Sequence, residues 1–175
     1  SAFVGNSFHD NSKSYIRAIY SYDEGETWSE PSDLIPLGEG DLNLMCVSFI
    51  RMQNDDLGIV YGRKYKMPDS DLVYSNIIFR RSSDEGKTWN YLSKIPFPKG
   101  TNADNIHEPW QLELENGDIL AFLRGQGKEV PFEFTVYLSK STDGGKTWSN
   151  PEGLGICGSP PHAFIHSSGA IVLTY

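Results

Sequence analysis

The residues best suited to chemistry in this 175-residue chain are a carboxylate and a guanidinium on either side of a hairpin turn. Glu108 precedes one predicted strand and Arg124 ends the next, with Asn116 and Gly117 as the turn between them. Antiparallel pairing sets position 108 opposite roughly position 125, so the two side chains should be neighbours. A carboxylate can transfer a proton, and a guanidinium can bind a planar acidic group. The structural alternative is an ion pair at an exposed rim.

Two histidines should lie at the same end of the strands as this pair. His107 directly precedes Glu108, and His162 begins the next predicted hairpin opposite Tyr175. Imidazoles can bind substrate or exchange protons near neutral pH. For each histidine alone, a hydrogen-bonded turn residue is the competing interpretation.

Arg63 and Asp10 complete the set of candidates. Arg63 ends a second strand one repeat earlier, nearly in the place that Arg124 holds in its own repeat. Asp10 lies in the loop ahead of a predicted strand over residues 15–20, which directs it toward the same end. A basic strand end and a solvated loop acid are the respective alternatives. We therefore predict Glu108 and Asp10 as catalytic residues and the two arginines and two histidines as substrate-binding residues.

The elements that must position these residues are short runs of β-branched and aromatic residues separated by turn residues. Three pairs of runs are predicted as hairpins: 47–50 with 57–61, 110–114 with 119–123, and 163–165 with 171–175. The first two hairpins are each followed by a third strand, at 77–80 or 135–138, and then by a fourth. Because no stretch of about ten residues has a helical apolar period, the sequence predicts an all-β fold. Four antiparallel strands per repeat are typical of a β-propeller blade.

The turn between the third and fourth strands carries the same eight-residue box, S-x-D-x-G-x-T-W, in three copies. The copies occupy residues 21–28, 82–89 and 141–148, a period of about sixty residues. In each copy the aspartate can accept backbone N–H bonds, the glycine can adopt a positive φ, and the tryptophan can pack between sheets. Because each copy belongs to a different blade, the three aspartates cannot share one active site. The box therefore indicates the fold and has no catalytic role.

The repeat also divides the chain. Residues 1–30 should hold the outer end of a first blade, 42–92 a second blade, 105–150 a third, and 160–175 the start of a fourth. A propeller needs at least about four blades to close. We therefore expect residues 1–175 to be part of one larger propeller domain, or copies to associate through their open blade edges.

The composition and net charge of the chain disfavour several classes of partner and site. The chain has 15 Lys and Arg against 23 Asp and Glu, a net charge of −8, which disfavours nucleic acid. No apolar run reaches the roughly 20 residues of a membrane span, and the first residues lack the features of a signal peptide, so the compartment is not predicted. Cys46 and Cys157 fit small buried residues better than a disulfide or metal pair. Neither a cofactor nor a metal is expected.

The boxes resemble those of the sialidase (neuraminidase) superfamily, also called bacterial neuraminidase repeats, whose members fold as six-bladed propellers. The segment HEPWQLELENGDILAFLRG resembles the family's glutamate-bearing third blade. GSPPHAFIHSSGAIVLTY resembles the start of the next blade, and NLMCVSFIRMQNDDLGIVYGRKY is similar to the second. The resemblance covers nearly the whole chain and implies that it holds about three of the six blades.

This resemblance implies a retaining exo-glycosidase that removes a terminal sialic acid or a related acidic sugar. In such enzymes three arginines bind the substrate carboxylate, and a tyrosine paired with a glutamate is the nucleophile. Glu108 matches that glutamate, Arg124 the second arginine, and Asp10 the aspartate that acts as acid and base. The tyrosine and the other two arginines have no match in residues 1–175, so we expect this chain alone to be inactive.

Two other functions fit the same residues. The first is a non-catalytic propeller that binds glycans or proteins, since a fold does not fix a function. The second is an enzyme for a different acidic glycoside or a neutral one, which the HEPW and SPPH segments fit nearly as well.

Overall fold

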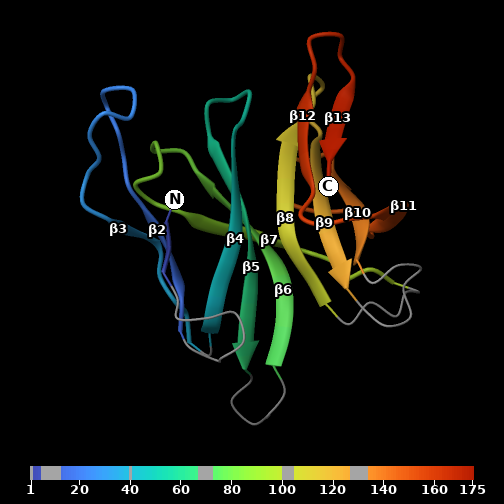
Figure 1. The fold of residues 1–175 in the computed structure, drawn as a ribbon, viewed down its shortest axis with the longest axis horizontal. Coiled ribbons are helices and arrows are strands. Elements are labelled where there is room, and N and C mark those ends of the chain that lie inside the picture. Colours follow the sequence, from blue (N-terminus) through green and yellow to red (C-terminus); the bar gives the residue numbers. More distant parts are fainter. Residues whose placement is uncertain (1, 5–12, 40, 67–72, 100–104, 127–133) are drawn as a thin grey trace. The chain divides into compact units, whose positions relative to one another are not determined.

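The computed structural model describes residues 2–4, 13–39, 41–66, 73–99, 105–126 and 134–175. Over these residues the chain forms strands β1 to β13 and no helix (Figure 1), so the prediction of an all-β fold is confirmed. In this described part, no helix long and apolar enough to span a membrane is present. The chain divides into two compact units, Ser1–Met45 with Arg63–Tyr74, and Cys46–Gly62 with Ser75–Tyr175.

The strands form four antiparallel sheets whose members follow one another in chain order. The first sheet contains β1 (Ala2–Val4), β2 (Tyr15–Ala18) and β3 (Ser32–Ile35). The second contains β4 (Asp41–Arg51), β5 (Leu57–Lys66), β6 (Val73–Ser82) and β7 (Asn90–Ile95). The third contains β8 (Asn105–Glu113), β9 (Ile119–Gln126), β10 (Phe134–Ser141) and β11 (Glu152–Cys157). The fourth is the hairpin of β12 (His162–Ile165) and β13 (Ile171–Thr174). Four strands joined consecutively make the blade of a β-propeller.

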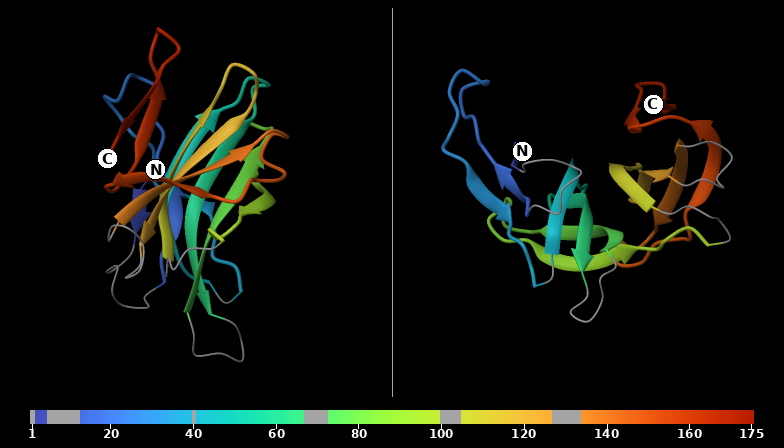
Figure 2. Two further views of the ribbon diagram at one scale, coloured as in Figure 1. Left: turned by 90° about the vertical axis from the view of Figure 1, so that its right-hand side faces the viewer. Right: turned by 60° about the horizontal axis from the view of Figure 1, so that its bottom comes forward.

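The core of the larger unit lies between two successive sheets. Ile77 and Phe79 of β6 pack with Ile119 and Leu123 of β9 and with Tyr137 of β10, and all five side chains are at most 2% exposed. Figure 2 shows the strands of this unit in two further orientations. Residues 119–123 of β9 are buried without interruption, which is typical of a strand that is covered on both faces. The sheets thereby hold the ends of β8 and β9 in fixed positions.

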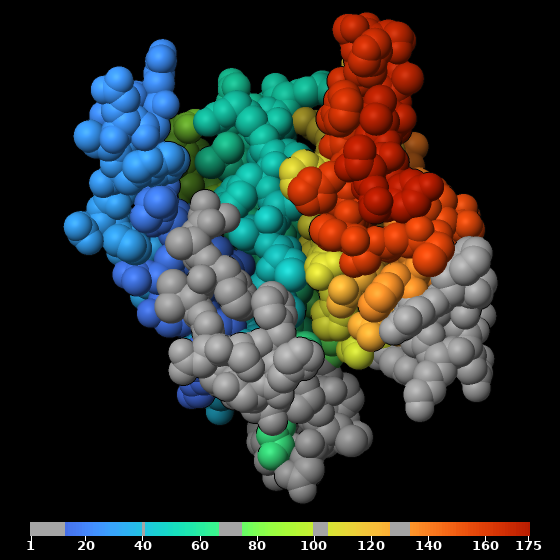
Figure 3. Space-filling model, viewed as in Figure 1, coloured from blue at the N-terminus to red at the C-terminus, as the bar shows by residue number. Residues whose placement is uncertain are grey.

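The hairpin β12–β13 lies next to the third sheet, with β12 beside β8. In the space-filling view the hairpin extends away from β8 to β11 of the same unit (Figure 3). Ala163 at its base is 4% exposed and packs with Phe122, whereas Phe164 further along is 53% exposed. The base of the hairpin is therefore anchored to the third sheet.

All three boxes close their turns in the same way. In each copy the aspartate accepts a hydrogen bond of 2.9 Å from the threonine N–H four residues later. The same aspartate also binds the threonine hydroxyl and the serine hydroxyl of its own box. The threonine hydroxyl bond is the main cause that lowers the pKa of Asp84 and Asp143 to about 2. The predicted structural role of the box aspartates is confirmed.

The box tryptophans differ from one another. Trp148 packs between sheets as predicted: its indole N–H donates to Ser93 Oγ of β7 at 2.9 Å, and its ring contacts Phe79 edge-on. The Trp28 ring is 58% exposed, and its indole N–H donates to Gly25 O within its own turn. Trp148 packs on the sheet of the preceding repeat. The described residues contain no repeat before that of Trp28, so packing of Trp28 between sheets stays a prediction.

Candidate functional site

Glu108 lies in a bulge of β8. The pairing of β8 with β9 runs from Glu113 opposite Ile119 to Trp110 opposite Phe122, and resumes with His107 opposite Arg124. The expected pairing of position 108 with position 125 is wrong in detail, because the register next to the turn already differs from it by one residue and the bulge adds a second. Glu108 and Arg124 are nevertheless neighbours, as predicted.

The backbone at Glu108 is in the left-handed region, with φ of 48°. This conformation is unfavourable for a residue with a Cβ, and such residues are enriched at functional sites. A bulge changes the direction of the side chain it carries. The local backbone therefore holds Glu108 in an orientation that regular pairing would not give.

Glu108, Arg124 and Ser159 form one hydrogen-bonded group. Arg124 Nη1 donates to Glu108 Oε1 at 3.1 Å and to Ser159 Oγ at 3.3 Å. The Ser159 hydroxyl donates to Glu108 Oε2 at 2.7 Å. The Glu108 and Arg124 side chains are 25% and 18% exposed. The ion pair is therefore partly buried and not fully exposed.

Phe134 orients the arginine. The Arg124 guanidinium carbon lies 5.1 Å from the centre of the Phe134 ring, within the range of a cation–π interaction. Two neighbours, the ring and the carboxylate, thus restrict the guanidinium. A cation held in one orientation binds an anionic group with little further ordering.

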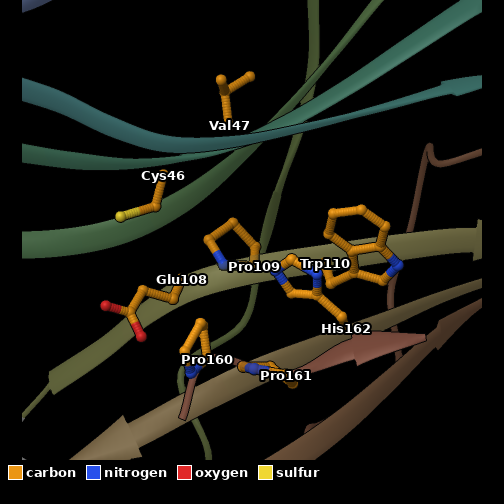
Figure 4. Close-up of a pocket in the computed structure, with 8 residues that line it drawn as sticks. All are labelled: Cys46, Val47, Glu108, Pro109, Trp110, Pro160, Pro161 and His162. Atoms are coloured by element: carbon orange, nitrogen blue, oxygen red, sulfur yellow. The ribbon is translucent and has the colours of Figure 1, made fainter. Parts of the chain in front are cut away.

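A pocket of about 300 Å³ opens beside Glu108. It collects residues from the first strands of two four-stranded sheets and from the start of the hairpin β12–β13 (Figure 4). Its lining consists of Cys46, Val47, Glu108, Pro109, Trp110, Pro160, Pro161 and His162. A mainly apolar lining with a few charged groups at one end is typical of a small-molecule site.

The four other predicted site residues differ in whether they lie at the pocket. His162 lines the pocket, whereas His107 is 7% exposed and is absent from the described lining. Arg63 belongs to the smaller compact unit, where it pairs with Asp41 at 2.5 Å and lies over the Tyr65 ring. Asp10 lies outside the described residues. Of the six candidates, Glu108 and His162 line the pocket, Arg124 is bonded to Glu108, and His107 lies opposite Arg124 in the strand pairing.

The third box lies at the opposite end of the same sheet. Ser141, which begins this box, pairs with Ile119 at the start of β9, whereas Arg124 near the end of β9 pairs with Val136. Asp143 and Glu108 are therefore separated by the length of the strands. This confirms, for the third copy, the prediction that boxes and candidate site occupy opposite faces.

Sequence reasoning did not identify Ser159, Trp110 or Cys46 as site residues. Ser159 directly precedes the Pro-Pro-His segment and is 51 residues from Glu108, so no local pattern links the two residues. Cys46 has φ of 53° near the middle of β4 and lines the same pocket. The one available signal was the repeat period, because Cys46 and Glu108 are about sixty residues apart.

A family model described as a BNR repeat-like domain matches residues 1–173. The chain belongs to the BNR repeat family. The resemblance of the three boxes to bacterial neuraminidase repeats is thereby confirmed, and the fold is that of a sialidase-type β-propeller in part.

Two curated relatives of this BNR chain are glycoside hydrolases by name. A xyloglucanase from Paenibacillus sp is 24% identical over 181 residues, which cover 97% of this chain and 16% of that protein. A sialidase from Paraclostridium sordellii is 28% identical over 142 residues, covering 76% of this chain and 32% of that protein. The chain thus spans less than a third of the length of either relative.

A solved structure supports the fold. The Hadza microbial sialidase Hz136 matches with a TM-score of 0.65 and 13% identity, over 87% of this chain and 34% of that one. At this identity the likeness concerns the fold alone. At the level of the family, this BNR chain is homologous to glycoside hydrolases.

Proposed function

We propose that this chain is the Glu108-bearing part of a retaining exo-glycosidase that removes a terminal sialic acid or a related acidic sugar from a glycan. The observation that carries the proposal is that Glu108, which lines the pocket, is hydrogen-bonded to both Arg124 and Ser159. A carboxylate beside an oriented guanidinium suits a reaction that combines proton transfer with binding of an anion. The homology to a sialidase supports the same assignment.

In this proposal Arg124 binds the substrate carboxylate through charge-assisted hydrogen bonds. Glu108 accepts the phenolic proton as a tyrosine from the remainder of the propeller attacks the anomeric carbon. A neutral phenol is a suitable nucleophile because a carboxylate would be repelled by the acidic substrate. Ser159 orients Glu108, and Asp10 supplies the acid for the leaving group and then the base for water.

The remaining candidates have supporting roles. His162 would contact the sugar from the pocket wall. His107, buried beside Arg124 in the strand pairing, would fix the strand that carries the arginine. Arg63 would bind an acidic group only by exchanging its present partner, Asp41.

Hydrolysis of a neutral glycoside is the second candidate. The mainly apolar lining of the pocket and the relative named as a xyloglucanase favour it. A non-catalytic glycan-binding propeller is the remaining alternative. Because the chain is short relative to its relatives, each of these activities concerns the longer protein that contains it.

Kinetics of two variants in the longest natural polypeptide containing residues 1–175 test the proposal. With a fluorogenic sialoside, Glu108→Gln should lower kcat by about 10²–10⁴-fold, because the amide cannot accept the proton. Arg124→Ala should also raise KM, because it removes a bond made before and during the reaction. Residues 1–175 alone should show no turnover. Unchanged kcat in Glu108→Gln would leave a binding propeller as the better account.

A further inference from the structure

The pocket has two aromatic rings stacked at the end away from Glu108, and these rings take no part in the proton transfer of the proposed reaction. The rings of Trp110 and His162 have centroids 4.3 Å apart and planes inclined by 14°. Trp110 comes from β8 and His162 from the start of β12, and both line the pocket. Figure 4 shows the imidazole lying over the indole, beside the two consecutive prolines.

Contacts with two neighbouring segments hold the indole of Trp110 in place. Trp110 Nε1 donates a hydrogen bond of 2.6 Å to the Ala163 carbonyl, which links β8 to β12. The indole also packs against the apolar cluster that contains Leu112 and Phe122. His162, in contrast, is an exposed residue whose backbone carbonyl binds Thr174. The stack therefore consists of a rigid inner ring and an accessible outer ring.

The chemistry of the two ends of the pocket is different. Glu108 provides the charge at one end, supported by its arginine and serine partners. The other end consists of Trp110, His162 and the apolar rings of Pro109, Pro160 and Pro161. Flat apolar surfaces of this kind bind ligand faces that carry C–H groups, because aromatic side chains bury a large area at little entropic cost. A pyranose ring has such a face, because axial C–H bonds on alternate carbons point to the same side of the ring.

We propose that the Trp110–His162 stack is a sugar-binding wall that takes the apolar face of a pyranose ring, with the imidazole of His162 as the ring that contacts the sugar. The proposal rests on the proposed function for the class of ligand, a glycan. The proposal adds that two separate groups of side chains bind different parts of the ligand. Arg124 selects for an acidic group, whereas the aromatic wall binds the uncharged ring face of acidic and neutral sugars alike.

Isothermal titration with two ligands tests this division in the longest natural polypeptide containing the chain. The ligands are the methyl α-glycoside of sialic acid and a neutral xyloglucan oligosaccharide. His162→Ala should weaken binding of every ligand that the wild type binds by about threefold to tenfold, the usual range for a lost aromatic contact. His162→Phe should restore most of the affinity, because it keeps the ring without the imidazole nitrogens.

His166 provides the matched control. It lies at the other end of β12, in the hairpin turn, where its ring binds Ser168 at 2.9 Å. His166→Ala should leave both affinities unchanged. Arg124→Ala should weaken binding of the sialoside and leave binding of the neutral oligosaccharide unchanged.

The outcomes separate this proposal from the proposed function. If only the neutral oligosaccharide binds and His162→Ala weakens it, the acidic-sugar function fails and the wall is supported. If the sialoside binds through Arg124 but His162→Ala has the affinity of wild type, the wall is refuted and the proposed function stands. Absence of binding of both ligands to the wild type would overturn the wall, as would equal effects of His162→Ala and His166→Ala.

Discussion

The two ends of the sheet β8–β11 are assembled in different ways. At the box end, Asp143 is bound by Ser141 and Thr147, which are two and four residues away in sequence. At the pocket end, Glu108 is bound by Arg124 and Ser159, which are 16 and 51 residues away. The box turn is thus completed by its own residues, whereas the pocket end requires three segments to be folded together. A local turn stabilises the blade, and the long-range assembly creates a site.

The repeats share the closure of their box turns but differ in the side chains at the pocket end. The bond from threonine N–H to aspartate has the same length in all three boxes, so each blade carries the same closure. A left-handed residue recurs in β4 and β8, but its side chain is Cys46 in one and Glu108 in the other. The repeat therefore supplies the same backbone position more than once, and the side chain placed there differs from blade to blade.

The largest effect on stability should come from Gly145→Ala, at the box end. Gly145 has φ of 87°, and an added Cβ would lie 2.2 Å from Cε1 of the fully buried Phe79. Gly117→Ala is the matched control, because φ is 82° there and the added Cβ would meet no atom within 4 Å. Overpacking should make Gly145→Ala about 1–3 kcal/mol more destabilising than the control in urea unfolding. Equal losses would show that the backbone conformation alone matters at this position.

A smaller effect is expected from Ser159→Ala, at the pocket end. The variant removes the hydroxyl that donates to Glu108 and accepts from Arg124. Loss of one hydrogen bond of this kind corresponds to about threefold to tenfold in kcat for the longer protein, with little change in unfolding. Ser168→Ala, in the exposed hairpin turn, serves as the control. A loss of stability without a loss of kcat would assign Ser159 a structural role only.

The smallest effect concerns the pH dependence of the box. The pKa of Asp143 is lowered from 3.8 to about 2, chiefly by the hydrogen bond from the Thr147 hydroxyl. Because the folded state binds this proton more weakly than the unfolded state, the carboxylate stabilises the fold above about pH 4 and loses that contribution as pH falls toward 2. The stability difference between wild type and Asp143→Asn should therefore shrink over this interval. A difference that is independent of pH would contradict the ionic origin of the stabilisation.

The parts of the structure that sequence predicted well are those determined by nearby residues. The turn at Asn116 and Gly117 was sufficient to place Glu108 near Arg124, because hairpin register follows from the turn. The register error at the pocket end is two residues: one is already present next to the turn, and the bulge, which no local residue pattern predicts, adds the other. The box turns were likewise predictable, since their hydrogen bonds stay within eight residues.

The parts that were missed depend on contacts between sheets. Trp110 and Ala163 are 53 residues apart, and the hydrogen bond between them fixes one wall of the pocket. Trp148 likewise packs against Phe79, which is 69 residues away in the sequence. Local sequence predicts that this tryptophan packs between sheets, but it does not predict which residue it contacts.

The most direct test of the account is the same chemical change at both ends of one sheet. Glu108→Gln and Asp143→Asn each replace a carboxylate by an amide of the same shape, and both can be assayed in one longer protein with one sialoside. The account predicts that Glu108→Gln lowers kcat by about 10²–10⁴-fold with little loss of stability. It predicts that Asp143→Asn destabilises the fold while kcat stays within about twofold of wild type, because its hydrogen bonds lie within the turn. Similar losses of kcat in the two variants, or unchanged kcat in Glu108→Gln, would contradict it.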